Sequence, residues 1–262
     1  MSQNNTLIQP FVLLDTRTHI TNDCFTTSPT NMYFYELQEP LTFSLIPSPY
    51  TEVIIAYNAS GNGCIYCVRC SSNMLTLTPD SFSHYFCIRF DDNAFYTAAD
   101  SPFSVPASLL NQTIRHTPKN GSPEDALIRQ LQNTTSFPER IHCFIDYLNN
   151  RMSVSFCPPG VSMVRHTIRE TDGFVTMNEL SAITGYSNRH INRIFTAYFG
   201  YGPKEYCKLV RFHKALSEIV KDPQRNNSQF ITQIGYSDQA HFQREFKMYM
   251  GETPRQFIKQ LM

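Results

Sequence analysis

The hydrophobic positions of this 262-residue chain change their period along its length, and the change separates two kinds of structure. In residues 1 to about 110, β-branched and aromatic residues form short runs that Pro, Gly, Asn and Ser interrupt. Such runs are typical of β-strands separated by turns. The runs are Phe11–Leu14, Met32–Tyr35, Thr42–Ile46, Glu52–Tyr57, Gly63–Val68, Met74–Thr78 and Tyr85–Phe90. Short strands at regular spacing predict a sandwich or a small barrel.

A helical period replaces the short runs in residues 116–158. Ser122–Asp125 has the form of a helix start, and a second helix is predicted to open at Pro138. Its apolar stripe has the i, i+3, i+4, i+7 spacing and consists of Ile141, Phe144, Ile145 and Leu148. The stripe predicts a buried face without naming what covers it. Cys157–Gly160, which contains two prolines, is the expected hinge to the remaining residues.

One pattern occurs twice in the last 90 residues. The first copy is Gly185-Tyr186-Ser187-Asn188, then Ile191, Arg193, Phe195, Tyr198, Gly200, Pro203 and Tyr206. The second copy is Gly235-Tyr236-Ser237-Asp238, then Phe242, Arg244, Phe246, Tyr249, Gly251, Pro254 and Phe257. The offset is 50 residues at the glycines and 51 from Ile191 onward, so the second turn carries one additional residue.

Each copy is predicted to be a helix, a glycine turn and a second helix. Thr176 and Glu179 have the spacing of a capping box, so a helix should begin at residue 177. Leu180 and Ile183 are expected to face inward on this helix. Gly185 suits a left-handed backbone at the helix end. Residue 187 is a serine, which makes a good N-cap for the helix that follows.

The second helix of each copy carries polar side chains opposite its buried stripe. In the first copy these are Arg189, Asn192, Arg193 and Thr196, and in the second they are Ala240, Gln243, Arg244 and Lys247. Arg can bind guanine, and Asn or Gln can bind adenine, each through two hydrogen bonds in the major groove. A solvated polar face would explain one copy equally well. Because an amide followed by Arg recurs at equivalent positions of both copies, we favour DNA reading.

A long helix is predicted between the copies. Gly202-Pro203 sets its start and Asp222-Pro223 its end. Such a helix is about 27 Å long, at 1.5 Å per residue. It could therefore hold two recognition helices about one DNA turn apart, so that they enter successive major grooves.

At these residues the chain resembles the DNA-binding domain of the AraC/XylS family of bacterial transcription regulators. The resemblance is carried by Gly185-Tyr186-Ser187, Ile191, Arg193, Phe195, Gly200, Pro203 and Tyr206, then by Gly235 to Gln239, Phe242, Arg244, Phe246-Lys247, Gly251 and Thr253-Pro254. The chain departs from the family at Ser181, Ile231 and Ala240. Ile231 is larger than the usual alanine and is expected to tilt the second unit, and Ala240 replaces a longer side chain.

The resemblance implies an α+β chain of two domains: a β-rich, cupin-like sensor at 1–115 and an all-α double helix-turn-helix domain at 161–262. Within the latter, the first unit is expected at about 177–199, the connecting helix at about 203–221 and the second unit at about 228–250. Residues 116–158 are then a linker with helices that either form a dimer contact or pack on their own domain. The expected DNA-contacting residues are Arg189, His190, Asn192, Arg193, Thr196, Gln239, Ala240, Gln243, Arg244 and Lys247.

The same resemblance implies partners and a mode of action. They are double-stranded promoter or operator DNA, RNA polymerase, a small-molecule effector bound by the first domain, and a second copy of the chain. The implied role is transcription activation. Aromatic side chains of the first domain are candidates to line an effector site, although they would fill a core equally well. They are Tyr33, Phe34, Tyr35, Phe43, Tyr57, Tyr66 and Phe86.

The balanced charge of the whole chain hides two unlike halves. Residues 161–262 hold 14 Lys and Arg against 9 Asp and Glu, a net of +5, whereas residues 1–160 hold 8 against 13, a net of −5. A basic half suits contact with phosphates. A charge of this size suggests binding that depends on salt concentration.

Seven of the eight cysteines lie in the first 160 residues. Met1–Asn5 is not a signal peptide, and no apolar run is long enough to span a membrane, so we expect a cytoplasmic chain with reduced thiols and no membrane contact. Cys64, Cys67 and Cys70 could form a thiol- or metal-responsive switch, which is the alternative function. On a strand, however, Cys67 would face away from the other two.

An enzyme is not expected from the sequence. Residues 1–110 contain His19 and His84 as their histidines, without the close pair that a metal site of a cupin enzyme would use. His190 and His241 correspond in the repeat and are expected near DNA phosphates rather than in catalysis. The sequence therefore predicts neither a catalytic site, nor a resident metal, nor a cofactor.

Overall fold

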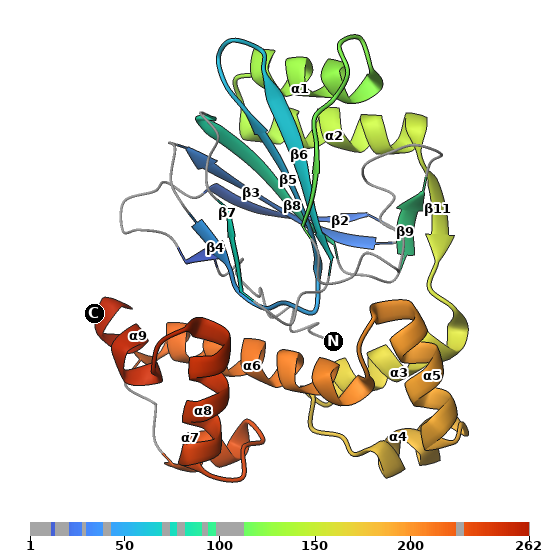
Figure 1. Cartoon of the computed structure of the whole chain (residues 1–262), viewed down its shortest axis with the longest axis vertical. Helices are drawn as coiled ribbons and strands as arrows, with labels where there is room; N and C mark the ends of the chain where they lie inside the picture. The colour runs from blue at the N-terminus through green and yellow to red at the C-terminus, as the bar shows by residue number, and fades with distance from the viewer. Residues whose placement is uncertain are drawn as a thin grey trace.

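The computed structural model contains a β-rich part and a helical part, which lie one above the other in Figure 1. It describes residues 12–13, 21–27, 30–38, 43–69, 74–77, 82–90, 94–97, 113–223 and 228–261. None of the helices in these ranges combines the length and apolar character that a membrane crossing requires.

An antiparallel sheet of six strands forms the centre of the β-rich part, in the order β10-β6-β5-β8-β3-β2. Its strands are β2 (Thr21–Thr27), β3 (Thr30–Gln38), β5 (Thr51–Tyr57), β6 (Gly63–Arg69), β8 (His84–Phe90) and β10 (Thr113–His116). Strand β5 is buried on both faces, because Val53 and Ile55 join one core cluster while Ile54 and Ala56 join another. The sheet has two edges, β10 and β2, so a closed cupin-like barrel is not confirmed.

Two helices cover one face of this sheet (Figure 1). They are α1 (Pro123–Asn133), capped by Ser122, and α2 (Phe137–Arg151), capped by Ser136. The predicted stripe of α2 packs against the sheet of its own chain, since Phe144 lies with its ring centroid 6.0 Å from those of both Phe34 and Phe86. The stripe was expected either to form a dimer contact or to pack on its own domain. The described residues show it packed on its own domain.

Two smaller sheets contain the remaining described strands. One contains β1 (Val12–Leu13), β4 (Phe43–Leu45) and β7 (Leu75–Leu77), and the other pairs β9 (Ala94–Thr97) with β11 (Ser153–Phe156). All seven predicted runs contain a strand. Among the described residues, the strands that were not predicted are β2, β9, β10 and β11. Most of these are short or rich in polar residues, so the hydrophobic pattern does not reveal them.

The helical part consists of α3 (Pro159–Glu170), α4 (Met177–Thr184), α5 (Asn188–Phe199), α6 (Pro203–Lys221), α7 (Ser228–Gln233), α8 (Gln239–Met250) and α9 (Pro254–Leu261). Figure 1 shows α6 as a strut, with α3, α4 and α5 at one end and α7, α8 and α9 at the other. Helix α3 was not predicted. It begins inside the expected hinge and packs against α4, α5 and α6.

The two parts meet where the loop between β4 and β5 touches the helices. Ile46 belongs to the core cluster of the helical part, and the carbonyl oxygen of Pro47 lies 2.7 Å from Nε2 of His213 on α6. The Tyr50 ring contacts two guanidinium groups, that of Arg89 on β8 at 5.3 Å and that of Arg169 on α3 at 5.2 Å from its centroid. The loop thus connects the sheet with both α3 and α6.

Candidate DNA-binding surface

The first helix-turn-helix unit is held by local caps. The capping box predicted at Thr176 is present: Glu179 N donates to the Thr176 hydroxyl at 3.2 Å, and Thr176 N donates to the Glu179 carboxylate at 2.7 Å. Gly185 ends α4 with φ 72°, in the left-handed region where glycine is favoured. Ser187 then caps α5 by accepting from His190 N.

The inward side of α5 packs on the connecting helix. Ile191, Phe195 and Phe199 are fully buried, and Phe195 meets Tyr206 of α6 edge-on at 5.4 Å between ring centroids. The prediction that Ile183 of α4 also faces inward is wrong, because its side chain is 53% exposed. The less exposed positions of α4 are Met177, Leu180, Ser181 and Thr184, at the i, i+3, i+4, i+7 spacing, so Ile183 lies outside the face that packs.

The second unit repeats this arrangement around α8. Gly235 has φ 89° between α7 and α8, and Asp238 caps α8 by accepting from His241 N at 2.7 Å. That hydrogen bond lowers the pKa of Asp238. Phe242 and Phe246 are fully buried on the inner side of α8.

Hydrogen bonds fix the second unit internally and to α6. Tyr249 of α8 donates to the part-buried Glu205 of α6 at 3.1 Å, and within the unit the buried Tyr236 donates to Glu245 at 2.8 Å. Arg211 of α6 lies over the Tyr236 ring at 5.7 Å. Burial and the neighbouring carboxylates raise the pKa of both tyrosines, so both remain protonated donors. Ile231, which departs from the family pattern, is accommodated in the core at 1% exposure.

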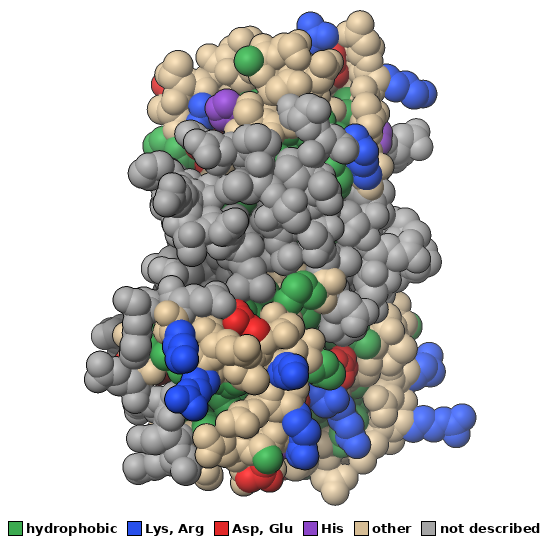
Figure 2. Space-filling model, turned by 60° about the vertical axis from the view of Figure 1, so that its left-hand side comes forward, with side chains coloured by type: hydrophobic (Ala, Val, Ile, Leu, Met, Phe, Trp, Pro, Cys, Tyr) green, Lys and Arg blue, Asp and Glu red, His purple; other side chains and the backbone are tan. Residues whose placement is uncertain are grey.

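The residues expected to contact DNA lie on the outer side of α5 and α8. In α5 the exposed ones are Arg189, Asn192, Arg193 and Thr196, with His190 partly buried. In α8 they are Gln239, Ala240, Gln243, Arg244 and Lys247, all exposed. The structure therefore gathers them on two helices at opposite ends of α6. Figure 2, which brings the α7–α9 side forward, shows Lys and Arg side chains spread over the helical part.

The two corresponding histidines have different neighbours. His190 Nδ1 lies 3.2 Å from a guanidinium nitrogen of Arg193, so the ring restricts where that guanidinium points. His241 Nδ1 lies 3.2 Å from the Ser237 hydroxyl, and its Nε2 lies 3.7 Å from the Glu245 carboxylate. Both rings thus contact polar groups of their own unit, where they can orient neighbouring side chains.

The aromatic residues proposed for an effector site do not lie together. Tyr35 and Tyr66 belong to the core cluster on one face of the six-stranded sheet, with Cys87 and Phe82. Phe34, Tyr57 and Phe86 belong to the cluster on the other face, under α1 and α2. Tyr33 is partly buried, and the side chain of Phe43 lies outside the described residues. The buried aromatic residues therefore belong to two separate hydrophobic cores, one on each face of the six-stranded sheet.

The cysteine cluster is divided in the same way. Cys64 packs in one of these clusters and Cys67 in the other, as the alternation along a strand predicts, and Cys70 lies outside the described residues. Burial raises the pKa of Cys67 to about 12. Among the residues that the structure describes, no group of three His, Cys, Asp or Glu side chains is placed to hold a metal ion.

Sequence reasoning missed the contribution of α3 to this surface. Its buried residues are Val161, Val164, Arg165 and Ile168, at the i, i+3, i+4, i+7 spacing that would have revealed it. At the start of α3, Gly160 lies close to Tyr186 and Ile194, so the helix supports the turn before α5 and α5 itself.

Comparison with known proteins concerns mainly this surface. Residues 180–260 match the family model described as a helix-turn-helix domain. The chain is 36% identical over 67 residues to the uncharacterized HTH-type transcriptional regulator YbfI of Bacillus subtilis, a match covering 26% of this chain and 24% of that protein. It is 24% identical over 156 residues to an uncharacterized HTH-type transcriptional regulator of Staphylococcus aureus (strain MSSA476), covering 59% of this chain and 20% of the relative. The matches thus span about a fifth to a quarter of these relatives' lengths.

A solved structure resembles nearly the whole chain. The crystal structure of an apo ToxT variant from Vibrio cholerae strain SCE256 aligns with a TM-score of 0.50 and 10% identity, over 90% of this chain and 99% of that one. At this identity the likeness concerns the fold: a β-sheet part followed by a helical part in one chain.

Proposed function

From an AraC-type helix-turn-helix domain at residues 180–260 as the premise, we propose that this chain is a sequence-specific transcription regulator that binds double-stranded DNA. The observation that carries the proposal is the repeated exposure of an amide followed by arginine. Asn192-Arg193 on α5 and Gln243-Arg244 on α8 are all exposed at opposite ends of α6.

The geometry suits two successive major grooves. Helix α6 has 19 residues, which corresponds to about 28 Å at the usual rise. One turn of DNA is about 34 Å, so recognition helices attached at both ends of such a strut can enter adjacent grooves on one side of the duplex. The Tyr249–Glu205 hydrogen bond and the contact of Arg211 with the Tyr236 ring keep the second unit in fixed relation to α6.

Each exposed side chain has a role in this proposal. Arg193 and Arg244 bind guanine edges, and Asn192 and Gln243 bind adenine edges. Arg189, Thr196, Gln239 and Lys247 contact phosphates or flanking bases, with His190 and Ala240 at the margin of the contact. We infer that base specificity resides mainly in the two amide–arginine pairs.

The proposal extends to regulation. We propose that the chain is a cytoplasmic activator that contacts RNA polymerase. We also propose that a cupin-like first domain binds a small effector and that residues 1–160 form a dimer. The resemblance of the sequence motifs supports each of these proposals. An effector acts by binding one conformation better than another. The loop from Ile46 to Tyr50, which touches both α3 and α6, offers a route from the sheet to the helices.

Selection of bound DNA from a random pool tests the function. The full chain is compared with a variant in which Arg193 and Arg244 are both replaced by alanine. We expect the full chain to enrich two short elements about one turn apart, about 10 base pairs between centres. The double variant should enrich neither. If the full chain enriches no motif, the exposed pairs do not read bases and the proposal fails.

A further inference from the structure

The corner between α3 and α4, residues 171–175, has a tightly defined backbone. Asp172 and Gly173 are both left-handed, with φ 49° and 77°, so the chain reverses direction directly after α3. Gly173 N donates to the Ile168 carbonyl oxygen at 2.7 Å, which closes the end of α3. The Phe174 side chain therefore projects from a corner of fixed shape at the entrance of the first helix-turn-helix unit.

This corner packs closely on the middle of α6. A Cβ on Gly173 would lie 2.9 Å from Cγ of Arg211 and closer still to the Cys207 carbonyl oxygen, so the approach requires glycine. Nζ of Lys214 lies 3.4 Å from the Asp172 carboxylate. From Cys207 to Lys214 the corner follows about two turns of α6, in the direction of the second unit.

The Phe174 ring occupies the space beside the glycine turn of the second unit. A Cβ on Gly235 would lie 2.5 Å from Cε2 of this ring and closer still to Cδ2. Carbon atoms that are not bonded pack at about 3.5–4.0 Å, so the ring edge lies directly on the Gly235 backbone. Gly235 belongs to the turn between α7 and α8 and has φ 89°. The two units are thus in direct contact, in addition to their connection through α6.

Arg211 of α6 lies between the corner and the turn. Its Cγ is close to the Cβ position of Gly173, its Cδ lies 3.2 Å from that of Gly235, and its guanidinium lies 5.7 Å over the Tyr236 ring. A small cleft of about 150 Å³ marks where the corner, α6 and the end of α7 converge. Its lining residues are Thr171, Asp172, Phe174, Lys214, Gln233 and Ile234.

The Phe174 side chain itself lies mostly on the surface. It is 62% exposed, whereas phenylalanine is ordinarily a buried residue. Replacing a side chain of this exposure changes folding stability little, so a variant without the ring should still fold. Loss of the ring therefore acts mainly on the contact between the two units.

We propose that Phe174 is a positioning residue that fixes the distance and angle between the two DNA-reading helices, α5 and α8. The inference rests on the proposed function, because it concerns how two units read one site. Phe174 lies two residues before Thr176, the cap of α4, and Gly235 lies three residues before Asp238, the cap of α8. Holding these two points together favours one spacing of the DNA elements and disfavours others.

Binding to sites of different spacing tests this role. The site selected by the full chain is compared with sites that have one base pair added or removed between the two elements, which moves one element about 3.4 Å along the duplex and about 35° around it. We expect the unmodified chain to bind the altered sites at least about tenfold more weakly. Phe174→Ala should reduce this preference at least about threefold. The proposal is overturned if the unmodified chain shows no spacing preference or if Phe174→Ala leaves it unchanged.

Two further variants separate positioning from a general effect of an altered surface. Phe174→Tyr keeps the ring edge beside Gly235 and should retain the spacing preference of the unmodified chain. Met163→Ala removes another exposed apolar side chain, 43% exposed on α3, and should change neither affinity nor spacing preference. If either variant relaxes the spacing as far as Phe174→Ala does, the ring is not the cause and the proposal is wrong.

A double-mutant cycle tests the contact itself. Gly235→Ala adds a Cβ where the ring lies and also imposes left-handed strain, so the unfolding equilibrium constant should rise. The strain remains when Phe174 is also replaced by alanine, whereas the clash does not. The rise caused by Gly235→Ala should therefore be at least about fivefold smaller in the Phe174→Ala chain. Equal rises would show that the ring does not occupy this space.

Failure of the proposed function gives a different result from failure of the positioning role. If the full chain enriches no DNA motif, the DNA-binding proposal fails, and the positioning role that rests on it fails as well, even where the double-mutant cycle confirms the contact. If the full chain enriches a motif whose spacing preference Phe174→Ala leaves unchanged, the positioning role alone fails.

Discussion

His213 and Pro47 join the two parts of the chain by a hydrogen bond that depends on the protonation of a histidine. Nε2 of His213 lies 2.7 Å from the Pro47 carbonyl oxygen, and the ring is buried in the middle of α6. The pKa of His213 is lowered to about 3, mainly by burial and also by repulsion from Arg89, although the Pro47 carbonyl opposes both effects. The neutral ring, which donates from Nε2, is therefore the form that suits the folded chain.

This pair predicts a loss of stability in acid. Because the pKa of His213 is lower in the folded chain than its ordinary value of 6.5, the unfolded chain binds more protons between about pH 3 and 6.5. The histidine's contribution is complete above pH 6.5 and falls by about 1.4 kcal/mol per pH unit below it.

Replacing His213 by glutamine isolates that contribution. The glutamine amide can still donate a hydrogen bond to the Pro47 carbonyl oxygen, but it does not titrate. The unfolding free energy of the unmodified chain should therefore fall about 2 kcal/mol further than that of the variant between pH 6.5 and pH 5. Urea titrations at each pH provide the measurement, and parallel profiles of the two proteins would contradict the assignment.

The two amide–arginine pairs predict matched losses of DNA binding. Arg193→Ala and Arg244→Ala should each weaken binding to the selected site by about 1–3 kcal/mol and relax the base preference at one element. Arg151→Ala, at the exposed end of α2, is the matched control and should leave affinity unchanged. If footprinting shows an unaltered base preference for the Arg193 variant, Arg193 does not contact bases.

Two glycines with similar backbone angles predict different costs when replaced by alanine. Gly173 has φ 77° and Gly185 has φ 72°, so each alanine pays about 1–2 kcal/mol of left-handed strain. A Cβ at Gly173 would also lie 2.3 Å from the Cys207 carbonyl oxygen of α6, whereas nothing lies within 4 Å at Gly185. Denaturant unfolding should show a loss of about 3 kcal/mol or more for Gly173→Ala and a smaller loss for Gly185→Ala. Equal losses would mean that α6 moves aside without cost.

The buried thiol of Cys67 predicts slow chemical modification. A pKa of about 12 lowers its thiolate fraction about a thousandfold relative to a thiol at the usual 9.0. In the folded chain, iodoacetamide should label the half-buried Cys143 long before Cys67, and unfolding should remove the difference. Mass spectrometry of the alkylated peptides gives the rates. Rapid labelling of Cys67 in the folded chain would revive a thiol switch.

The sequence by itself determined the elements whose causes are local. The capping box at Thr176, the left-handed Gly185 and the Ser187 cap each depend on residues within one turn of the chain, and all three are present. Because the motif occurs twice, its two copies could be compared with each other. The comparison correctly predicted that α5 and α8 each have a buried side and an opposite polar side. Seven strands were found because each is an apolar run between turn residues.

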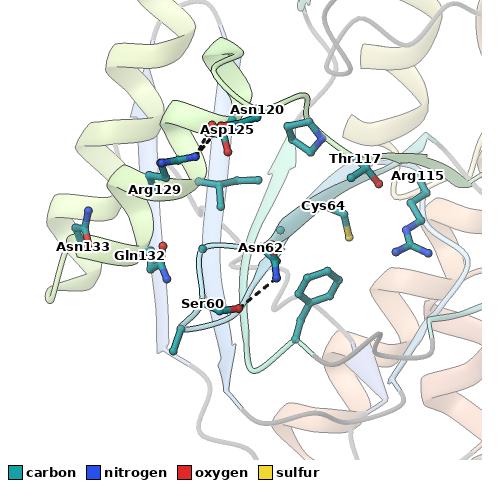
Figure 3. A pocket seen from close by; sticks show the side chains of 16 residues that line it. Ser60, Asn62, Cys64, Arg115, Thr117, Asn120, Asp125, Arg129, Gln132 and Asn133 are labelled. Carbon is teal, nitrogen blue, oxygen red and sulfur yellow. Dashed lines mark hydrogen bonds and ion pairs between the residues drawn. The ribbon is translucent and has the colours of Figure 1, made fainter.

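Tertiary structure decided what depends on distant residues. Ile183 has an apolar side chain three residues after Leu180 but stays exposed, because the packed face of α4 runs through Leu180, Ser181 and Thr184 instead. The contact of Pro47 with His213 joins positions 166 residues apart, and no pattern in either segment announces it. A polar hollow of about 790 Å³ beside the six-stranded sheet (Figure 3) likewise needs the β5–β6 turn, β10 with the residues after it, and α1 to converge, so packing decides its volume. Hydrogen bonds within a turn can be inferred from spacing, whereas a cavity or an interface exists once the chain has brought separate segments together.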